Sequence, residues 1–139
     1  MKQPKPGTLF NVFCYGTLEF DAVMKKVTGA NFASEKATLI DYARYLVKAA
    51  PYPAIVHQLG TITEGTLLRG MSVQQKQRMD EYEGSLYDRI PNDVLVAKGE
   101  LVPAQIYIVP ASRMHYVSKL PWNKNEFELL YLKDFFRTL

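Results

Sequence analysis

Two short segments of this chain carry residue types that can hold an anion and move protons. In Tyr15-Gly16-Thr17-Leu18, a glycine breaks an apolar stretch, and the backbone amides after it are available to bind an anion. Residues 79–84, Met-Asp-Glu-Tyr-Glu-Gly, place Glu83 directly before a second glycine. A carboxylate in such a position can take up a proton and return it. An amide-lined turn and a carboxylate are what an enzyme needs to hold a substrate and move its protons.

Each segment is expected to end a regular element. Residues 9–15 are rich in aromatic and β-branched types, which predicts a strand that leads into the first turn. Ser72 and Gln75 have the spacing of a capping box, so a helix is predicted from Ser72 to a terminal cap at Gly84. The sequence therefore predicts that a strand end and a helix end position the two segments.

The rest of the chain is dominated by strand patterns, with helices near both ends. Gly65 interrupts one of these strands, which indicates a bulge or a close backbone approach. The predicted strands are 37–42, 44–47, 54–57, 61–69, 87–90, 93–97 and 102–109, and the predicted helices are a short one capped by Asp21 and stopped by Gly29 and a last one over 126–139 capped by Asn125. This order predicts an α+β fold, a small mixed β-barrel flanked by helices.

Size and composition indicate one globular domain. The chain has 139 residues, of which 47% are apolar and 22% charged. We expect a flexible N-terminal lead-in over 1–8 and a single domain over 9–139 that includes the C-terminal helix. The net charge of +3 is small and no run of about five like charges occurs, so no nucleic-acid partner is expected.

The cysteine, the histidines and the apolar residues bear on the location of the protein and on metal and membrane binding. Cys14 is the single cysteine and lies in a predicted strand, so we expect a small buried side chain, no internal disulfide and a cytoplasmic location. His57 and His115 are far apart with no other ligand at a suitable spacing, so no metal site is predicted. No apolar run reaches the roughly 18 residues of a membrane helix, and no membrane association is expected.

Four motifs in order resemble the gamma-glutamylcyclotransferase-like family. This family includes the gamma-glutamylamine cyclotransferases and the plant avirulence-induced (AIG2-like) proteins. The motifs are Tyr15-Gly16-Thr17-Leu18, Tyr52-Pro53-Ala54, Gly65-Thr66-Leu67-Leu68, and Asp80-Glu81-Tyr82-Glu83-Gly84 followed by Tyr87-Asp88-Arg89. The similarity runs from about Phe10 to Tyr107, most of the chain.

The resemblance implies a fold, a reaction and a set of site residues. The fold would be a small β-barrel flanked by helices, with one cavity beside the turn. The reaction would cleave a γ-glutamyl amide by attack of the α-amine on its own γ-carbonyl, giving 5-oxoproline and a free amine or amino acid without a cofactor. By resemblance, Glu83 takes the place of the catalytic acid/base, and Tyr15, Gly16, Thr17 and Leu18 that of the substrate-binding turn.

The residues themselves leave alternatives to these roles. Glu83 could be an ordinary solvated carboxylate before a helix stop, and Gly16 and Thr17 could serve only the turn. Because a helix rotates about 100° per residue, only one acid among residues 80–83 is expected to face a cavity. Tyr52 is a candidate for the cavity wall. Tyr87 and Arg89 are expected to pack and pair at the barrel rim, with Tyr87 a secondary candidate for the pocket.

Two functions from different classes are therefore open. The favoured one is an enzyme of the gamma-glutamylamine cyclotransferase type that acts on a small-molecule γ-glutamyl substrate. The alternative is a non-catalytic small-molecule or peptide binding domain that uses the same cavity. The sequence names neither the leaving amine nor an oligomeric state, and the segment 112–117 is suggested as a rim or lid by its position alone.

Overall fold

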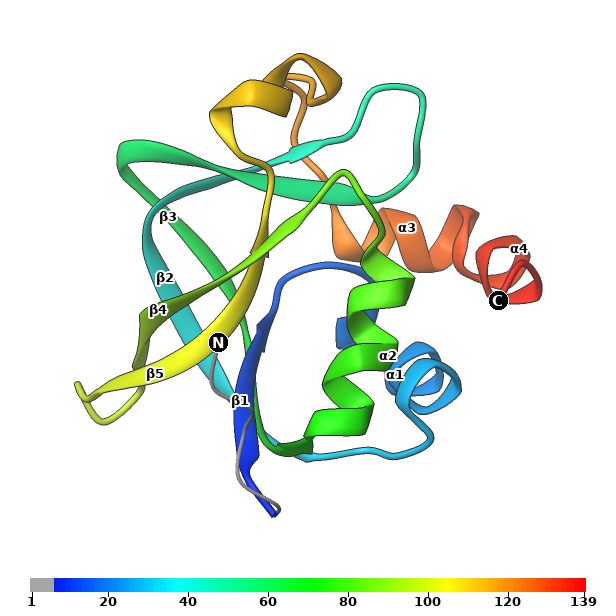
Figure 1. Cartoon of the computed structure of the whole chain (residues 1–139). Helices are drawn as coiled ribbons and strands as arrows, with labels where there is room; N and C mark the ends of the chain where they lie inside the picture. The colour runs from blue at the N-terminus through cyan, green and yellow to red at the C-terminus, as the bar shows by residue number, and fades with distance from the viewer. Residues whose placement is uncertain (1–6) are drawn as a thin grey trace.

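A computed structural model describes residues 7–139 of the chain. The predicted lead-in, 1–8, lies outside these residues except for its last two positions. The strands are β1 (Leu9–Cys14), β2 (Ala33–Leu46), β3 (Pro53–Ser72), β4 (Asp88–Val96) and β5 (Leu101–Ile108). They close on themselves in the order β1-β3-β2-β4-β5, and every pair is antiparallel except β1–β5. The predicted α+β fold, a small mixed barrel flanked by helices, is confirmed (Figure 1).

The long strands run through positions that the sequence suggests as breaks. Segments 37–42 and 44–47 form one strand, β2, except for Val47, and segments 54–57 and 61–69 both belong to β3. Asp41 of β2, at a φ of 65°, lies opposite the irregular segment 58–61 of β3, and its carboxylate accepts a hydrogen bond of 2.9 Å from the amide of Gly60. The two residues thus interact within a continuous hairpin, and neither ends its strand.

Pro91 likewise lies inside a strand, because β4 joins the predicted segments 87–90 and 93–97. Pro91 pairs with Gln105 of β5 on one side, and β2 pairs with β4 only at Leu95 and Val96. At Pro91, β4 therefore has a partner strand on one side only, and such an edge is where a sheet tolerates proline.

Helix α2 (Val73–Glu83) has the boundaries that the sequence predicts. The Ser72 side chain accepts from the Gln75 amide at 3.2 Å, and the Gln75 side chain accepts from the Ser72 amide at 2.9 Å. Gly84, at a φ of 77°, ends the helix, and its amide donates a hydrogen bond of 3.1 Å to the carbonyl of Asp80. Both caps are local, and both place Glu83 at the last position of the helix.

The other helices depart from the predictions at their starts. Helix α1 (Asp21–Thr28) is capped by Phe20 and not by Asp21, although Gly29 ends it as predicted. The predicted helix 126–139 is two helices, α3 (Lys124–Leu130) and α4 (Leu132–Arg137), separated at Tyr131. Asn123, not Asn125, caps α3, because its side chain reaches the amide of Glu126 at 2.8 Å.

The helices gather at one side of the barrel (Figure 1). Alternation along β1 serves two cores: Val12 and Cys14 face the helices, whereas Phe13 and Tyr15 face the barrel interior. The close approach predicted at Gly65 is confirmed, because a Cβ there would lie 2.6 Å from the Phe13 ring and against the Cys14 carbonyl. The end of β1 therefore packs closely between the barrel interior and the helices.

Candidate active site

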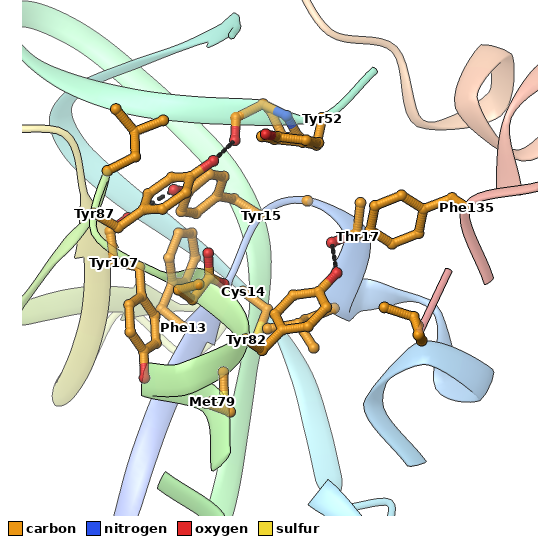
Figure 2. A pocket seen from close by; sticks show the side chains of 16 residues that line it. Phe13, Cys14, Tyr15, Thr17, Tyr52, Met79, Tyr82, Tyr87, Tyr107 and Phe135 are labelled. Carbon is orange, nitrogen blue, oxygen red and sulfur yellow. Dashed lines mark hydrogen bonds between the residues drawn. The ribbon is translucent and has the colours of Figure 1, made fainter. Parts of the chain in front are cut away.

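A cavity of about 270 Å³ lies where β1 ends, between the barrel and helix α2. At about 30 Å³ per water it holds roughly nine waters, so a group the size of an amino acid fits. All seven residues that the sequence analysis proposes for the site line this cavity: Tyr15, Gly16, Thr17, Leu18, Tyr52, Glu83 and Tyr87 (Figure 2). The structure therefore brings three separate motifs to one place.

The turn after β1 has a geometry that demands glycine. A Cβ on Gly16 would lie 2.8 Å from the Cγ of Pro53, so no larger residue fits beneath that proline. The amide of Glu19 donates to the Gly16 carbonyl at 3.0 Å and starts the short 3₁₀ helix η1 (Thr17–Glu19). Among residues 7–139, nothing accepts a hydrogen bond from the amides of Thr17 and Leu18, so both are free to bind an anionic oxygen.

The Glu83 carboxyl lines the cavity and has no hydrogen-bond partner among the described residues. Burial and the nearby charge of Asp80 raise its pKa from the ordinary value of 4.5 to about 8. Glu83 keeps part of its surface accessible, because it lines the cavity. A carboxyl with this pKa is a stronger base than usual and holds a proton reversibly near neutral pH.

Tyrosine hydroxyls fix the shape of the wall around Glu83. The hydroxyls of Thr17 and Tyr82 are hydrogen-bonded at 2.7 Å, and the Tyr87 hydroxyl donates to the carbonyl of Pro53 at 2.8 Å. The Tyr15 hydroxyl donates to a backbone carbonyl of β5 at 2.6 Å. Burial raises the pKa of both Tyr82 and Tyr87, so these groups stay protonated. The three bonds tie the turn, the loop after α2 and the barrel into one wall.

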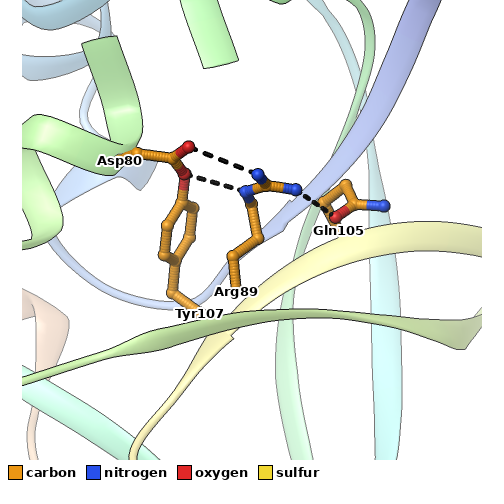
Figure 3. Close-up of polar contacts among 4 residues, drawn as sticks. All are labelled: Asp80, Arg89, Gln105 and Tyr107. Atoms are coloured by element: carbon orange, nitrogen blue, oxygen red, sulfur yellow. Dashed lines mark hydrogen bonds and ion pairs between the residues drawn. The ribbon is translucent and has the colours of Figure 1, made fainter. Parts of the chain in front are cut away.

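Asp80, one helical turn before Glu83, is the centre of a separate polar cluster (Figure 3). The Tyr107 hydroxyl donates to its carboxylate at 2.5 Å and the Arg89 Nε at 2.8 Å, while Arg89 also donates to the Gln105 side chain at 2.7 Å. Burial alone would raise the pKa of Asp80, but the bonds from Arg89 and Tyr107 outweigh it and lower the pKa. An ionised carboxylate therefore stands beside Glu83.

The three acids near the end of α2 thus differ in surroundings. Asp80 is paired, Glu81 is exposed to solvent and Glu83 lines the cavity. The expectation that one of them faces the cavity is confirmed. Arg89 pairs at the rim of the barrel as predicted, and it does not line the cavity.

Several lining residues were not anticipated from the sequence. Tyr82 precedes Glu83 directly, and Tyr107 belongs to a strand that reads only as barrel wall. Phe135 lies in α4 and Leu139 follows that helix, in a C-terminal segment whose apolar face indicates packing but no site. The signal in each case is an aromatic or aliphatic residue indistinguishable from core, so spacing alone could not find it.

The segment suggested as a lid has another role. It folds as the 3₁₀ helix η2 (Ala111–Tyr116) and contributes no side chain to the cavity. Arg113 donates to the Leu86 carbonyl at 3.0 Å and to Asp88 at 2.6 Å. Leu86 lines the cavity, so η2 braces the loop behind the wall.

The predicted burial of Cys14 is confirmed. Burial, together with the charges of Glu83 and Glu19, raises the pKa of its thiol. The thiol is therefore protonated and unreactive at neutral pH. No three His, Cys, Asp or Glu side chains of residues 7–139 are grouped as a metal ion would require. None of the helices in this part of the chain has the length and apolar character to cross a membrane.

Comparison with known proteins identifies the family. The model described as "Gamma-glutamyl cyclotransferase, AIG2-like" matches residues 12–124, well over half of the chain. This protein therefore belongs to the gamma-glutamyl cyclotransferase, AIG2-like family, and the resemblance drawn from the four motifs is confirmed.

Two curated relatives from Arabidopsis thaliana are similar in sequence. Protein AIG2 C is 30% identical over 99 residues, which are 70% of this chain and 60% of that protein. AIG2-like protein D is 32% identical over 89 residues, or 64% of this chain and 59% of that protein. The matched part thus spans about 60% of the length of these relatives.

Solved structures share the fold. A solution structure of an Arabidopsis thaliana protein superposes with a TM-score of 0.71 at 25% identity, over 94% of this chain and 87% of that one. A structure of a gamma-glutamyl cyclotransferase gives 0.66 at 18% identity, over 73% and 67%. An AIG2-like protein from Mus musculus gives 0.63 at 22% identity, over 84% and 86%. The latter two similarities concern the fold alone.

Proposed function

We propose that this protein is a cyclotransferase that cleaves a γ-glutamyl amide and releases 5-oxoproline. The observation that carries the proposal is the state of Glu83. Its carboxyl opens into an amino-acid-sized cavity, has no hydrogen-bond partner among the described residues and has a pKa raised by burial to about 8. A buried carboxyl left unpaired costs stability, so this arrangement points to a role in proton transfer.

The first step forms the ring. The substrate's α-nitrogen attacks its own γ-carbonyl carbon, and Glu83 takes the proton that this nitrogen loses. The carbonyl π electrons move to oxygen and leave an oxyanion. The free amides of Thr17 and Leu18 are suited to holding an anionic oxygen of the substrate, either this oxyanion or the α-carboxylate.

The second step breaks the amide. The oxyanion re-forms the carbonyl, the bond from carbon to the leaving nitrogen breaks, and Glu83 returns its proton to that nitrogen. The products are 5-oxoproline and a free amine or amino acid, and Glu83 is restored. Both reacting groups belong to one substrate, so the protein contributes by folding the glutamyl chain and by moving one proton. The two steps need no further proton donor or acceptor.

The experiment measures 5-oxoproline release from a panel of γ-glutamyl amines and γ-glutamyl amino acids. The native protein is expected to form product, and Glu83→Gln is expected to fold but to lose the activity. Glu81→Gln is the matched control, because Glu81 is an exposed glutamate on the same helix turn that does not line the cavity.

Equal rates for the native protein and Glu83→Gln would overturn the assigned role of Glu83. Product from no panel member, with ligand binding retained in Glu83→Gln, would instead indicate the binding domain that uses the same cavity. Circular dichroism of each variant confirms that the comparison is between folded proteins.

A further inference from the structure

Arg44 of β2 holds the backbone of the turn after β1. Its Nη1 donates to the carbonyl of Tyr15 at 2.8 Å and to the carbonyl of Glu64 in β3 at 3.1 Å. Its guanidinium also lies over the ring of Trp122, with Cζ 5.5 Å from the ring centroid. Trp122 is itself buried and donates from Nε1 to the Pro51 carbonyl at 2.9 Å. These contacts fix the guanidinium against the start of the turn.

The carbonyl that Arg44 binds belongs to the same peptide unit as the amide of Gly16. In a trans peptide unit such as this one, the carbonyl and the amide point in opposite directions. The Gly16 amide therefore points away from Arg44, and it has no hydrogen-bond acceptor among residues 7–139. Gly16 lines the cavity and Arg44 does not, so the guanidinium approaches the turn from outside the cavity.

Arg44 brings a positive charge to the turn. Arginine stays charged at neutral pH even where burial lowers its pKa, as it does here. None of the ion pairs of the described residues includes Arg44. Glu19 is near enough to stabilise the charge, but its carboxylate accepts a hydrogen bond of 3.0 Å from the Thr66 hydroxyl and makes no contact of that kind with Arg44. A half-buried cation without an ion pair costs stability, which points to a use for its charge.

The charge acts on the turn in two ways. A cation that donates to a carbonyl strengthens the amide of the same peptide unit as a donor, because linked hydrogen bonds polarise one another. The charge also makes the potential at the turn more positive, and this effect is larger in a partly buried site than in water. Both effects favour an anionic oxygen at the amides of residues 16–18.

We propose that Arg44 is a positioning residue that orients the Tyr15–Gly16 peptide unit and strengthens the turn as a binding site for an anionic oxygen of the substrate. The inference rests on the proposed cyclotransferase function for the identity of the ligand. The anionic oxygen is either the α-carboxylate, which is charged before the reaction, or the oxyanion, which forms during ring closure. Weaker binding of the carboxylate raises KM, whereas weaker binding of the oxyanion lowers kcat.

The first measurement compares two ligands that share a ring and differ in charge. 5-Oxoproline carries a carboxylate and 5-oxoprolinamide a neutral amide, and NMR titration of the backbone amides gives both dissociation constants. If the carboxylate occupies the turn, Arg44→Gln lowers the ratio of the two affinities in favour of 5-oxoproline by roughly tenfold. Arg44→Lys is expected to retain most of the ratio, because lysine keeps the charge and can donate to a carbonyl.

The second measurement is the rate of 5-oxoproline release from a γ-glutamyl amide. If the oxyanion occupies the turn, Arg44→Gln lowers kcat by roughly tenfold with little change in KM, and Arg44→Lys restores most of kcat. Arg78→Gln is the matched control in both measurements. Arg78 of α2 likewise donates from Nη1 to a backbone carbonyl, that of Thr28 at 3.1 Å, and neither residue lines the cavity.

The outcomes separate this inference from the proposed function. Arg44→Gln that weakens both ligands equally and leaves kcat unchanged overturns the inference, because that result describes a general disturbance of the turn. Losses in Arg44→Lys as large as those in Arg44→Gln overturn it too, because the charge is then without effect. Product from no γ-glutamyl substrate counts against the cyclotransferase, and the affinity ratio alone then decides on Arg44: a fall in Arg44→Gln supports its role, and an unchanged ratio overturns it.

Discussion

Replacing Glu83 by glutamine is expected to stabilise the protein, and more so as the pH rises. The pKa of Glu83 is 4.5 in an ordinary environment, which represents the unfolded chain, and about 8 in the folded protein. Between these values the folded state binds one proton more than the unfolded state. The free energy of unfolding therefore falls as the pH increases through this window. Glutamine has no proton to lose, so the variant escapes this loss.

The magnitude follows from the two pKa values. Stability changes by about 1.4 kcal/mol for each pH unit over which the two states differ by one proton. Over the window from 4.5 to about 8, the loss reaches about 5 kcal/mol at most. Water in the cavity screens the partly accessible carboxyl, so the measured gain lies below this limit. The native protein and the variant should be similar at the acid end of the window and furthest apart above it.

Urea denaturation at about pH 5, 7 and 9 measures the difference directly. Glu81→Gln serves again as the control, because Glu81 is an exposed glutamate on the same helix turn that does not line the cavity. A stability difference between Glu83→Gln and the native protein that is equal at all three pH values would refute the reasoning. It would show that Glu83 titrates alike in the folded and unfolded chains.

Two further predictions test the surroundings of the site. Asp80→Asn removes a charge that raises the pKa of Glu83, so the acid limb of the kcat/KM profile should move to lower pH; an unmoved limb would show that Arg89 already cancels this charge. Gly65→Ala places a methyl group against the Phe13 ring and the Cys14 carbonyl, and should lower stability by about 1–3 kcal/mol in urea denaturation, whereas an unchanged midpoint would contradict the close packing.

Local features of the fold could be predicted, because their causes lie within a few residues. The capping box of Ser72 and Gln75 and the terminal cap at Gly84 act across one helical turn, and both are present. Asp41 and Gly60 show the opposite case. They interact across 19 positions of sequence within a continuous hairpin, and the sequence pattern divides each of its long strands into two.

The residues of the candidate site likewise fall into those that the sequence predicts and those that it does not. Glu83 and the turn at Gly16 stand out through glycines and a carboxylate in recognisable motifs. Tyr107 and Phe135 enter the cavity only through tertiary packing, and their residue types are those of any core. The pKa of Glu83 was equally inaccessible, because burial by distant segments is its main cause.

The hydrogen bonding around the cavity connects the stability prediction to the proposed reaction. The hydroxyls of Tyr15, Tyr82 and Tyr87 each have a partner, and no fully buried polar side-chain atom of residues 7–139 lacks one. The Glu83 carboxyl and the amides of the turn are left free in the same cavity. A substrate with an amine and an anionic oxygen satisfies both. The unpaired carboxyl lowers the free energy of unfolding, and the same lack of a partner leaves it free for proton transfer. Glu83→Gln should therefore gain stability and lose turnover together.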